Sequence, residues 1–121
     1  MLERSDSIYK KDPIAALRLF QDDVNVNKQY FIYIATNVKH TVLYTGITNN
    51  LIKRGFQHKI GQGSFFTSKY KVTKIVYYEI SQEPLEAIKR EKQIKNLVRR
   101  KKIMLINELN PTWSDLIKDL V

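Results

Sequence analysis

The sequence contains no cysteine, so it has no disulfide, no thiolate metal ligand and no cysteine nucleophile. Its longest apolar run, residues 30–35, is far shorter than the roughly 20 residues that a membrane-spanning helix needs. The first residues lack the apolar segment of a secretory signal peptide. We therefore expect a cytoplasmic protein, not a membrane protein, with one domain in its 121 residues.

Acidic side chains are scarce: 12 aspartates and glutamates stand against 21 lysines and arginines, for a net charge of +9. Residues 53–74 carry six basic and no acidic side chains, and residues 89–102 carry eight basic and one acidic. Residues 1–27 carry four basic and five acidic side chains. Two basic segments favour a polyanionic partner, nucleic acid first and an anionic membrane surface second. The alternative is a solvated, lysine-rich surface without a ligand.

Three strands and three helices are predicted from the pattern of apolar residues. The strand over 30–35 is aromatic and β-branched throughout, which is typical of a central strand buried on both faces. Pro84 opens one helix, and Asn110-Pro111 ends the last. The order β-β-α-β-α-α predicts an α+β fold, a small sheet flanked by helices. Strands are expected at 30–35, 42–47 and 75–80, helices at about 50–60, 84–98 and 99–109, and a basic loop with a short helical or extended piece at 61–74.

The domain is expected to span residues 29–121, preceded by an N-terminal extension over residues 1–28. Within the extension, Asp12 can cap a short helix that begins at Pro13 and runs to about residue 20. Its apolar residues suit either the edge of the core or a partner. Residues 25–28 are predicted to link the extension to the domain.

The most informative group of residues begins with Tyr44-Thr45-Gly46. Arg54 and His58 follow ten and fourteen residues after Tyr44, and their spacing of four places them on one helix face, one turn apart. A phenol, a guanidinium and an imidazole near the end of a strand can handle a phosphate. A carboxylate that holds a metal would complete such a site.

Glu91 is the candidate for that carboxylate. It interrupts an apolar stripe in the helix that follows Pro84, formed by Leu85, Ile88, Ile94 or Lys95, and Val98. A carboxylate on a buried stripe is costly unless a cation balances it. The pattern leaves two interpretations open: an ion pair with Lys92 or Lys95, or a metal ligand.

Together these residues resemble the GIY-YIG nuclease superfamily, and its small, single-domain UPF0213 or YhbQ-like members most closely. The likeness spans about residues 29–117. Two departures stand out: Phe31 occupies the place of a glycine, and Ile47-Thr48 stand where some members carry a lysine. The late asparagine that some members use corresponds to either Asn96 or Asn110. The matching segments are Phe31-Ile32-Tyr33, Tyr44-Thr45-Gly46, Arg54 with His58, Ala87 with Glu91, and the tail from Asn110 to Leu116.

The resemblance implies a three-stranded antiparallel sheet flanked by helices and metal-dependent hydrolysis of phosphodiester bonds. In it, Tyr33 and Tyr44 face each other, and one of them, with Tyr44 favoured, orients or deprotonates the attacking water. Arg54 holds the phosphate, His58 assists proton transfer or polarises Tyr44, and Glu91 ligates Mg²⁺ or Mn²⁺. Gly46 belongs to the motif backbone. Nucleic-acid contacts are expected from the basic segments, at Lys53, Lys59, Lys69, Lys71, Lys92, Lys95, Arg99 and Arg100.

Three functions follow as hypotheses. The first is an endonuclease that acts on DNA rather than RNA, directed by structure or with weak sequence specificity, as a monomer or weak dimer. The second is a nucleic-acid-binding module with the same fold and little or no catalysis. The third, an adaptor, depends on residues 1–28.

Overall fold

The computed structural model describes residues 29–118, so the helix and linker expected within residues 1–28 lie outside the described residues. The elements follow the predicted order, and the basic loop contains the short helix α4. The fold is α+β, as predicted. Its strands are β1 (Tyr30–Thr36), β2 (Leu43–Thr48) and β3 (Lys74–Ser81), and its helices are α3 (Leu51–Lys59), α4 (Phe65–Lys69), α5 (Pro84–Lys95) and α6 (Arg99–Leu109).

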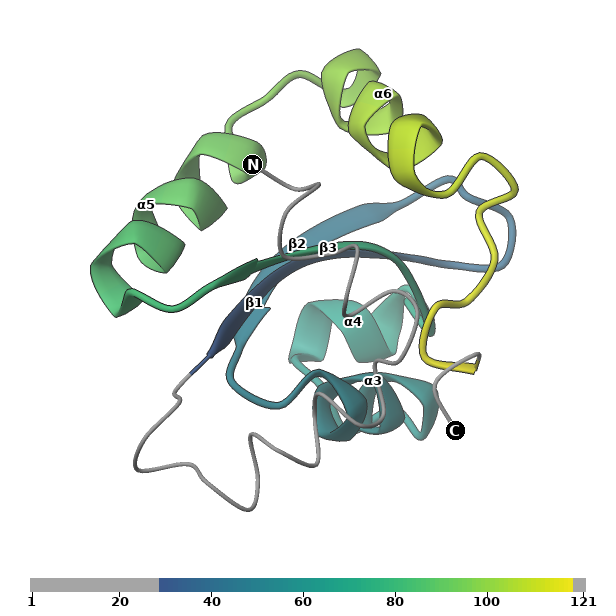
Figure 1. The fold of residues 1–121 in the computed structure, drawn as a ribbon. Coiled ribbons are helices and arrows are strands. Elements are labelled where there is room, and N and C mark those ends of the chain that lie inside the picture. Colours follow the sequence, from purple (N-terminus) through teal and green to yellow (C-terminus); the bar gives the residue numbers. More distant parts are fainter. Residues whose placement is uncertain (1–28, 119–121) are drawn as a thin grey trace.

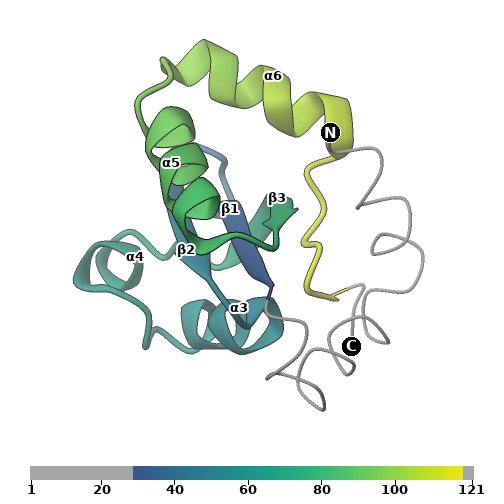
Figure 2. The same cartoon turned by 60° about the vertical axis from the view of Figure 1, so that its left-hand side comes forward.

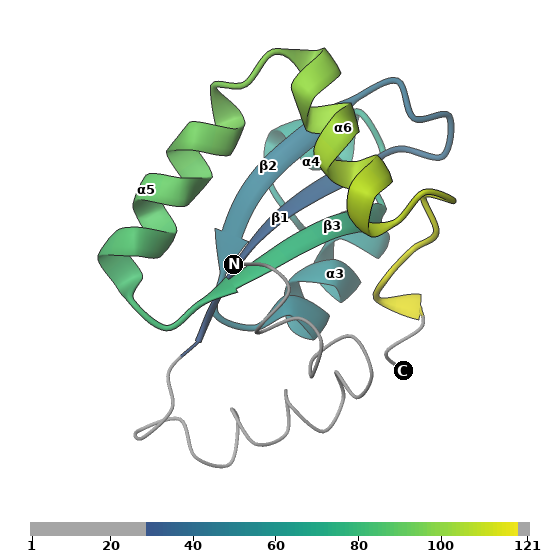
Figure 3. The ribbon, with the colours of Figure 1, turned by 45° about the horizontal axis from the view of Figure 1, so that its top comes forward.

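The three strands form an antiparallel sheet in the order β2-β1-β3 (Figure 3). The first strand in the chain is therefore central, and six of its seven residues are buried, as its apolar composition predicted. Tyr33 lies opposite Gly46 on β2 and opposite Tyr78 on β3. This register fixes which residues of the edge strand β2 surround Tyr33.

Helices cover both faces of the sheet, with α5 and α6 on one side and α3 and α4 on the other (Figures 1 and 2). Alternation along β1 divides the core between these layers. Ile32 and Ile34 pack with Ala87, Ile94 and Ile106 on the α5–α6 side. On the α3 side, the buried cluster consists of Phe31, Tyr33, Ala35, Leu51, Val72, Ile75, Tyr78 and Ile117.

Phe31, the departure from the family's glycine, has a clear structural role. Its side chain is 2% exposed and meets the Tyr78 ring edge to face, with 6.1 Å between ring centroids. The Phe31 ring belongs to the core on the α3 side of the sheet, so a large apolar side chain fits at this position. The fold therefore accommodates phenylalanine where the family motif has glycine.

The helix after Pro84 differs from its prediction in length and in its buried face. Helix α5 ends at Lys95 rather than near Val98, and Glu83 precedes it without a side-chain cap. The predicted stripe was wrong in three members, because Leu85, Ile88 and Val98 are 77%, 44% and 58% exposed. Of the predicted stripe only Ile94 is buried, and it shares its face with Ala87, seven residues earlier, within the described part of α5.

Candidate active site

Gly46 provides the space in which the Tyr33 side chain lies. A β-carbon added at position 46 would be 2.4 Å from the Tyr33 oxygen and 2.5 Å from its Cζ. The Tyr33 ring therefore crosses β2 directly over this glycine. The motif glycine is required for close packing of a side chain, a reason that the sequence alone did not supply.

Helix α3 carries Arg54 and His58 to the same region. The side chain of Asn50 caps this helix by accepting a hydrogen bond from the Lys53 backbone N–H. His58 is 2% exposed, and its Nε2 shares a hydrogen bond of 2.9 Å with the Tyr33 hydroxyl. The Tyr44 ring completes the group, with centroids 6.3 Å from Tyr33 and 5.9 Å from His58.

Burial keeps both partners of this hydrogen bond uncharged at neutral pH. Removal from water, and then the charge of Arg54, lower the pKa of His58 to about 4. Burial also raises the pKa of Tyr33, and Tyr44 and the Glu91 carboxylate add to the rise, whereas Arg54 opposes it. The hydrogen bond therefore joins an uncharged phenol to an uncharged imidazole, and the fixed positive charge resides on Arg54.

Glu91 is half-buried on α5, close enough for its charge to act on Tyr33. Within residues 29–118 its carboxylate makes no hydrogen bond or ion pair, so the pairing with Lys92 or Lys95 is not formed. Both lysines are exposed. Of the two interpretations of Glu91, this geometry leaves the carboxylate free for a cation.

The single carboxylate of Glu91 suits a metal ion whose other ligands are water and substrate phosphate oxygens. In the described part of the chain, no three His, Asp or Glu side chains gather to hold a metal by themselves. Mg²⁺ is commonly bound through one or two carboxylates, with waters and substrate phosphates as its other ligands. One unpaired carboxylate, Glu91, whose charge acts on the same phenol as the charge of Arg54, is consistent with that mode.

Residues that the sequence did not single out surround His58. Its Nδ1 is buried without a hydrogen-bond partner, and a β-carbon at Gly63 would lie 2.7 Å from it. Next to it, the ring of Phe66 stacks on Tyr44 with 5.9 Å between centroids. The only sequence feature that could have indicated Phe66 is its place in an aromatic pair, Phe65-Phe66, within a basic loop. A pair of adjacent residues has no repeating pattern from which its position in the site could be predicted.

The predicted nucleic-acid contacts are all exposed, but two of them are already engaged. Lys59 is paired with Asp115 and donates to the Thr73 carbonyl. Arg99 donates to the His40 carbonyl at 2.9 Å. The others have exposed side chains: Lys53, Lys69, Lys71, Lys92, Lys95 and Arg100.

Asn110, one of two candidates for the family's late asparagine, has a structural role. It is 5% exposed, and its side-chain amide donates to the Val76 and Ser114 carbonyls at 3.0 and 2.8 Å. It thereby joins the segment after α6 to β3. Asn96 is the exposed C-cap of α5.

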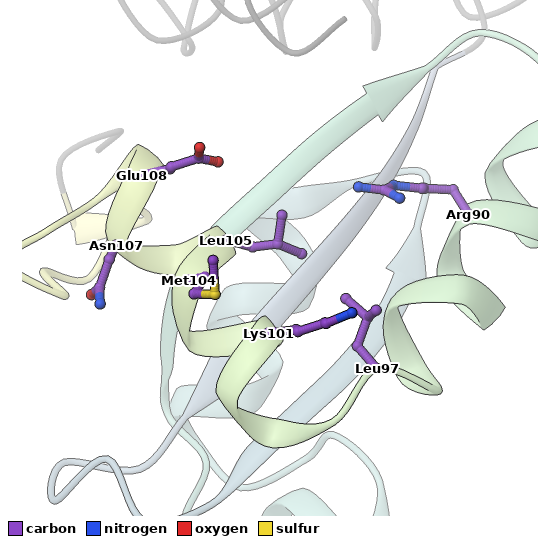
Figure 4. Close-up of a pocket in the computed structure, with 7 residues that line it drawn as sticks. All are labelled: Arg90, Leu97, Lys101, Met104, Leu105, Asn107 and Glu108. Atoms are coloured by element: carbon purple, nitrogen blue, oxygen red, sulfur yellow. The ribbon is translucent and has the colours of Figure 1, made fainter.

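A separate cleft of about 580 Å³ lies between α5 and α6 (Figure 4). Its charged wall includes Arg90, whose guanidinium is engaged by two bonds of 2.8 Å to the buried Glu79 carboxylate. Glu79 also accepts from the Tyr77 hydroxyl. This cleft is distinct from the candidate site, because its lining includes none of the five candidate residues: Tyr33, Tyr44, Arg54, His58 and Glu91.

The fold and the clustered side chains define a GIY-YIG catalytic domain. That family matches residues 29–107, and the chain therefore belongs to the GIY-YIG family, a family of nucleases. Within the described residues, no helix has the length and apolar character needed to cross a membrane.

The similar proteins are UPF0213 members of this family. UPF0213 protein SSP2268 of Staphylococcus saprophyticus is 39% identical over 80 residues, covering 66% of this chain and 96% of that protein. UPF0213 protein CPE1444 of Clostridium perfringens is 42% identical over 77 residues, covering 64% and 82% respectively. The solution structure of UPF0213 protein BH0048 from Bacillus halodurans has a TM-score of 0.47 at 25% identity and covers 72% of this chain and 92% of that one.

Proposed function

We propose that the protein is a metal-dependent endonuclease that hydrolyses phosphodiester bonds in DNA, acting in the cytoplasm as a monomer or weak dimer. The observation that carries the proposal is the hydrogen-bonded Tyr33–His58 pair, with Arg54 beside it and an unpaired Glu91 within electrostatic reach. We propose that binding follows DNA structure or a weak sequence preference.

Arg54 binds the phosphate and balances the charge that develops on it, because a guanidinium donates two parallel hydrogen bonds to such oxygens. Tyr33, rather than the Tyr44 that the resemblance favoured, orients the attacking water, because Tyr33 is the phenol that is hydrogen-bonded to His58; the proton of the water leaves to solvent. His58 holds the phenol in place, since burial keeps the imidazole uncharged and its pKa of about 4 makes it a weak base at neutral pH. Tyr44 packs against both rings and helps to position the water.

Glu91 would hold Mg²⁺ or Mn²⁺. When bound, such a cation supplies positive charge that stabilises the phosphate oxygens and the leaving oxygen. Without it, the Glu91 carboxylate raises the pKa of Tyr33 and so opposes proton release from the phenol. We therefore infer that cleavage depends on the divalent ion.

Replacing the carboxylate tests this function. Glu91→Gln should reduce cleavage of nicked or branched DNA in Mg²⁺ or Mn²⁺ by about 100-fold or more, since a charged ligand is lost at nearly constant volume. Glu86→Gln is the matched control, because Glu86 lies on the same helix, is 66% exposed and pairs only with Lys89. Undiminished cleavage by Glu91→Gln would contradict the proposed mechanism.

The second candidate is a nucleic-acid-binding module without useful catalysis. The replacement of the motif glycine by Phe31 and the absence of the lysine at Ile47-Thr48 favour it. Under this alternative, DNA binding falls steeply with salt because neutralised phosphates release counterions, yet no product forms with any metal. A panel of single-stranded, branched, flapped and duplex substrates separates the two candidates.

A further inference from the structure

A row of aromatic rings leads outward from the candidate site. Tyr44 stacks on Phe66 at 5.9 Å with an angle of 27° between ring planes, and Phe66 meets Tyr70 at 4.8 Å and 46°. Phe66 and Tyr70 are 41% and 42% exposed, so water reaches both rings. We call Tyr44, Phe66 and Tyr70 the aromatic row.

Helix α4 holds the outer rings of this row without burying them in the core. It is only five residues long, and its single buried residue is Thr67. Isolated helices of this length do not persist in water. A reciprocal cap between Ser64 and Thr67, together with a bond of 2.6 Å from the Ser68 hydroxyl to the Gly61 carbonyl, keeps it in place. The rings are thus fixed at the surface by polar contacts.

The charge around the row favours a polyanion. The Lys69 ammonium lies 5.5 Å from the centroid of the Tyr70 ring, and Lys71, the next residue after Tyr70, is exposed. No acidic side chain occurs between residues 53 and 74. Exposed aromatic rings interleaved with lysines are the combination with which proteins bind unpaired nucleotides: bases stack on the rings and lysines neutralise the backbone.

We propose that Phe66 and Tyr70 form a stacking site for an unpaired nucleobase beside the phosphate held at the catalytic cluster. The base must be unpaired, because in a continuous duplex both of its faces are covered by neighbouring bases. This inference rests on the proposed function for the placement of the phosphate, since the row begins at Tyr44 of the cluster. The preferred substrate then has a single-stranded or frayed segment at the cleaved position.

The test measures binding in EDTA, where no metal-dependent cleavage occurs. Affinity for a short single-stranded oligonucleotide containing 2-aminopurine is compared with affinity for a blunt duplex. Phe66→Leu, which keeps apolar volume but removes the ring face, should weaken single-strand binding by roughly 5- to 100-fold. It should also remove the quenching of 2-aminopurine and leave duplex binding unchanged.

Two further variants make the result specific. Phe65→Leu is the matched control on the same helix, because Phe65 is 82% exposed and makes no ring contact within residues 29–118. It should bind like the wild type, and Phe66→Trp should retain quenching. Wild-type affinity in Phe66→Leu, or equal losses in Phe65→Leu and Phe66→Leu, would overturn the stacking site.

Cleavage assays on the same variants separate this inference from the proposed function. Metal-dependent cleavage with no effect of Phe66→Leu on single-strand binding overturns the stacking site and leaves the nuclease standing. Quenching that depends on Phe66, in a protein that cleaves nothing with Mg²⁺ or Mn²⁺, supports the stacking site and overturns the nuclease.

Discussion

At the scale of single residues, Gly46 controls where Tyr33 can lie. Gly46→Ala places a methyl group 2.4 to 2.8 Å from three atoms of the Tyr33 phenol, so the ring or β2 must shift. We expect a stability loss of about 1–3 kcal/mol, typical of overpacking, and a loss of cleavage larger than the unfolded fraction explains. Urea denaturation and initial cleavage rates measure the two effects.

The neighbouring residue provides the control for that substitution. Thr45 is 5% exposed and its hydroxyl has no hydrogen-bond partner among the described residues. Thr45→Val keeps the shape of the side chain and removes an unsatisfied polar group, so stability should be unchanged or slightly higher. Equal damage from Thr45→Val and Gly46→Ala would show that any change in this part of β2 disrupts the site.

His58 should make stability depend on pH. The folded-state pKa of His58 is about 4, below the ordinary value of 6.5, so the unfolded chain binds a proton at higher pH than the folded protein does. The contribution of the neutral His58 to the free energy of unfolding is present above about pH 6.5 and is lost as the pH falls towards 4. It amounts to at most about 3 kcal/mol. Unfolding titrations at pH 7.5 and 4.5 measure it. His58→Gln should flatten this change more than His40→Gln does, since burial and the charge of Lys74 lower the pKa of His40 too.

At the scale of the elements, most of the fold could be predicted because local signals agreed with the tertiary structure. Aromatic and β-branched runs mark all three strands, and Pro84 stands at the start of α5 as its sequence position predicts. The buried face of α5 was predicted only at Ile94, because Leu85 and Ile88 also look like core residues, whereas packing against the sheet buries Ala87 in their place. The sequence did not decide between a helical and an extended piece at α4, because polar caps rather than an apolar repeat define this helix.

Asn110 tests how the last segment is held to the sheet. Asn110→Ala removes the two hydrogen bonds that the amide nitrogen donates and those that its oxygen accepts from Thr112 and Ser114, and it leaves the buried Val76 carbonyl without this donor, which should cost about 1–3 kcal/mol. The cleavage rate per folded molecule should stay near wild type, because Asn110 serves packing rather than chemistry. A normal melting temperature together with lost cleavage would instead assign Asn110 to the active site.

The candidate catalytic cluster combines elements that are distant in sequence, and this limits what sequence can reveal about it. The ordered motif identified Tyr33, Tyr44, Arg54, His58 and Glu91 as candidates. It did not indicate that His58 bonds to Tyr33, because that contact depends on how α3 packs against β1. Nor did it indicate Phe66, which reaches Tyr44 through the loop after α3.

At the scale of the whole molecule, the net charge of +9 should govern the affinity for DNA. Lys92 and Lys95 are exposed on α5, whereas Lys59 is paired with Asp115. Replacing Lys92 and Lys95 with Gln should weaken binding to all sequences alike and reduce the slope of log affinity against log salt, by roughly 0.9 per lost phosphate contact. Lys59→Gln should change this slope less. Binding isotherms at several salt concentrations provide the comparison.

The central claim is that Tyr33, paired with His58, acts in phosphodiester hydrolysis. Single-turnover cleavage in Mg²⁺ or Mn²⁺ by the wild type, Tyr33→Phe and Tyr30→Phe tests it most directly, because Tyr30 lies on the same strand and packs with the cluster on the opposite face of the sheet. We predict product from the wild type and Tyr30→Phe, and a rate at least about 100-fold lower for Tyr33→Phe. No product from the wild type with either metal, or equal rates for Tyr33→Phe and the wild type, would contradict the claim.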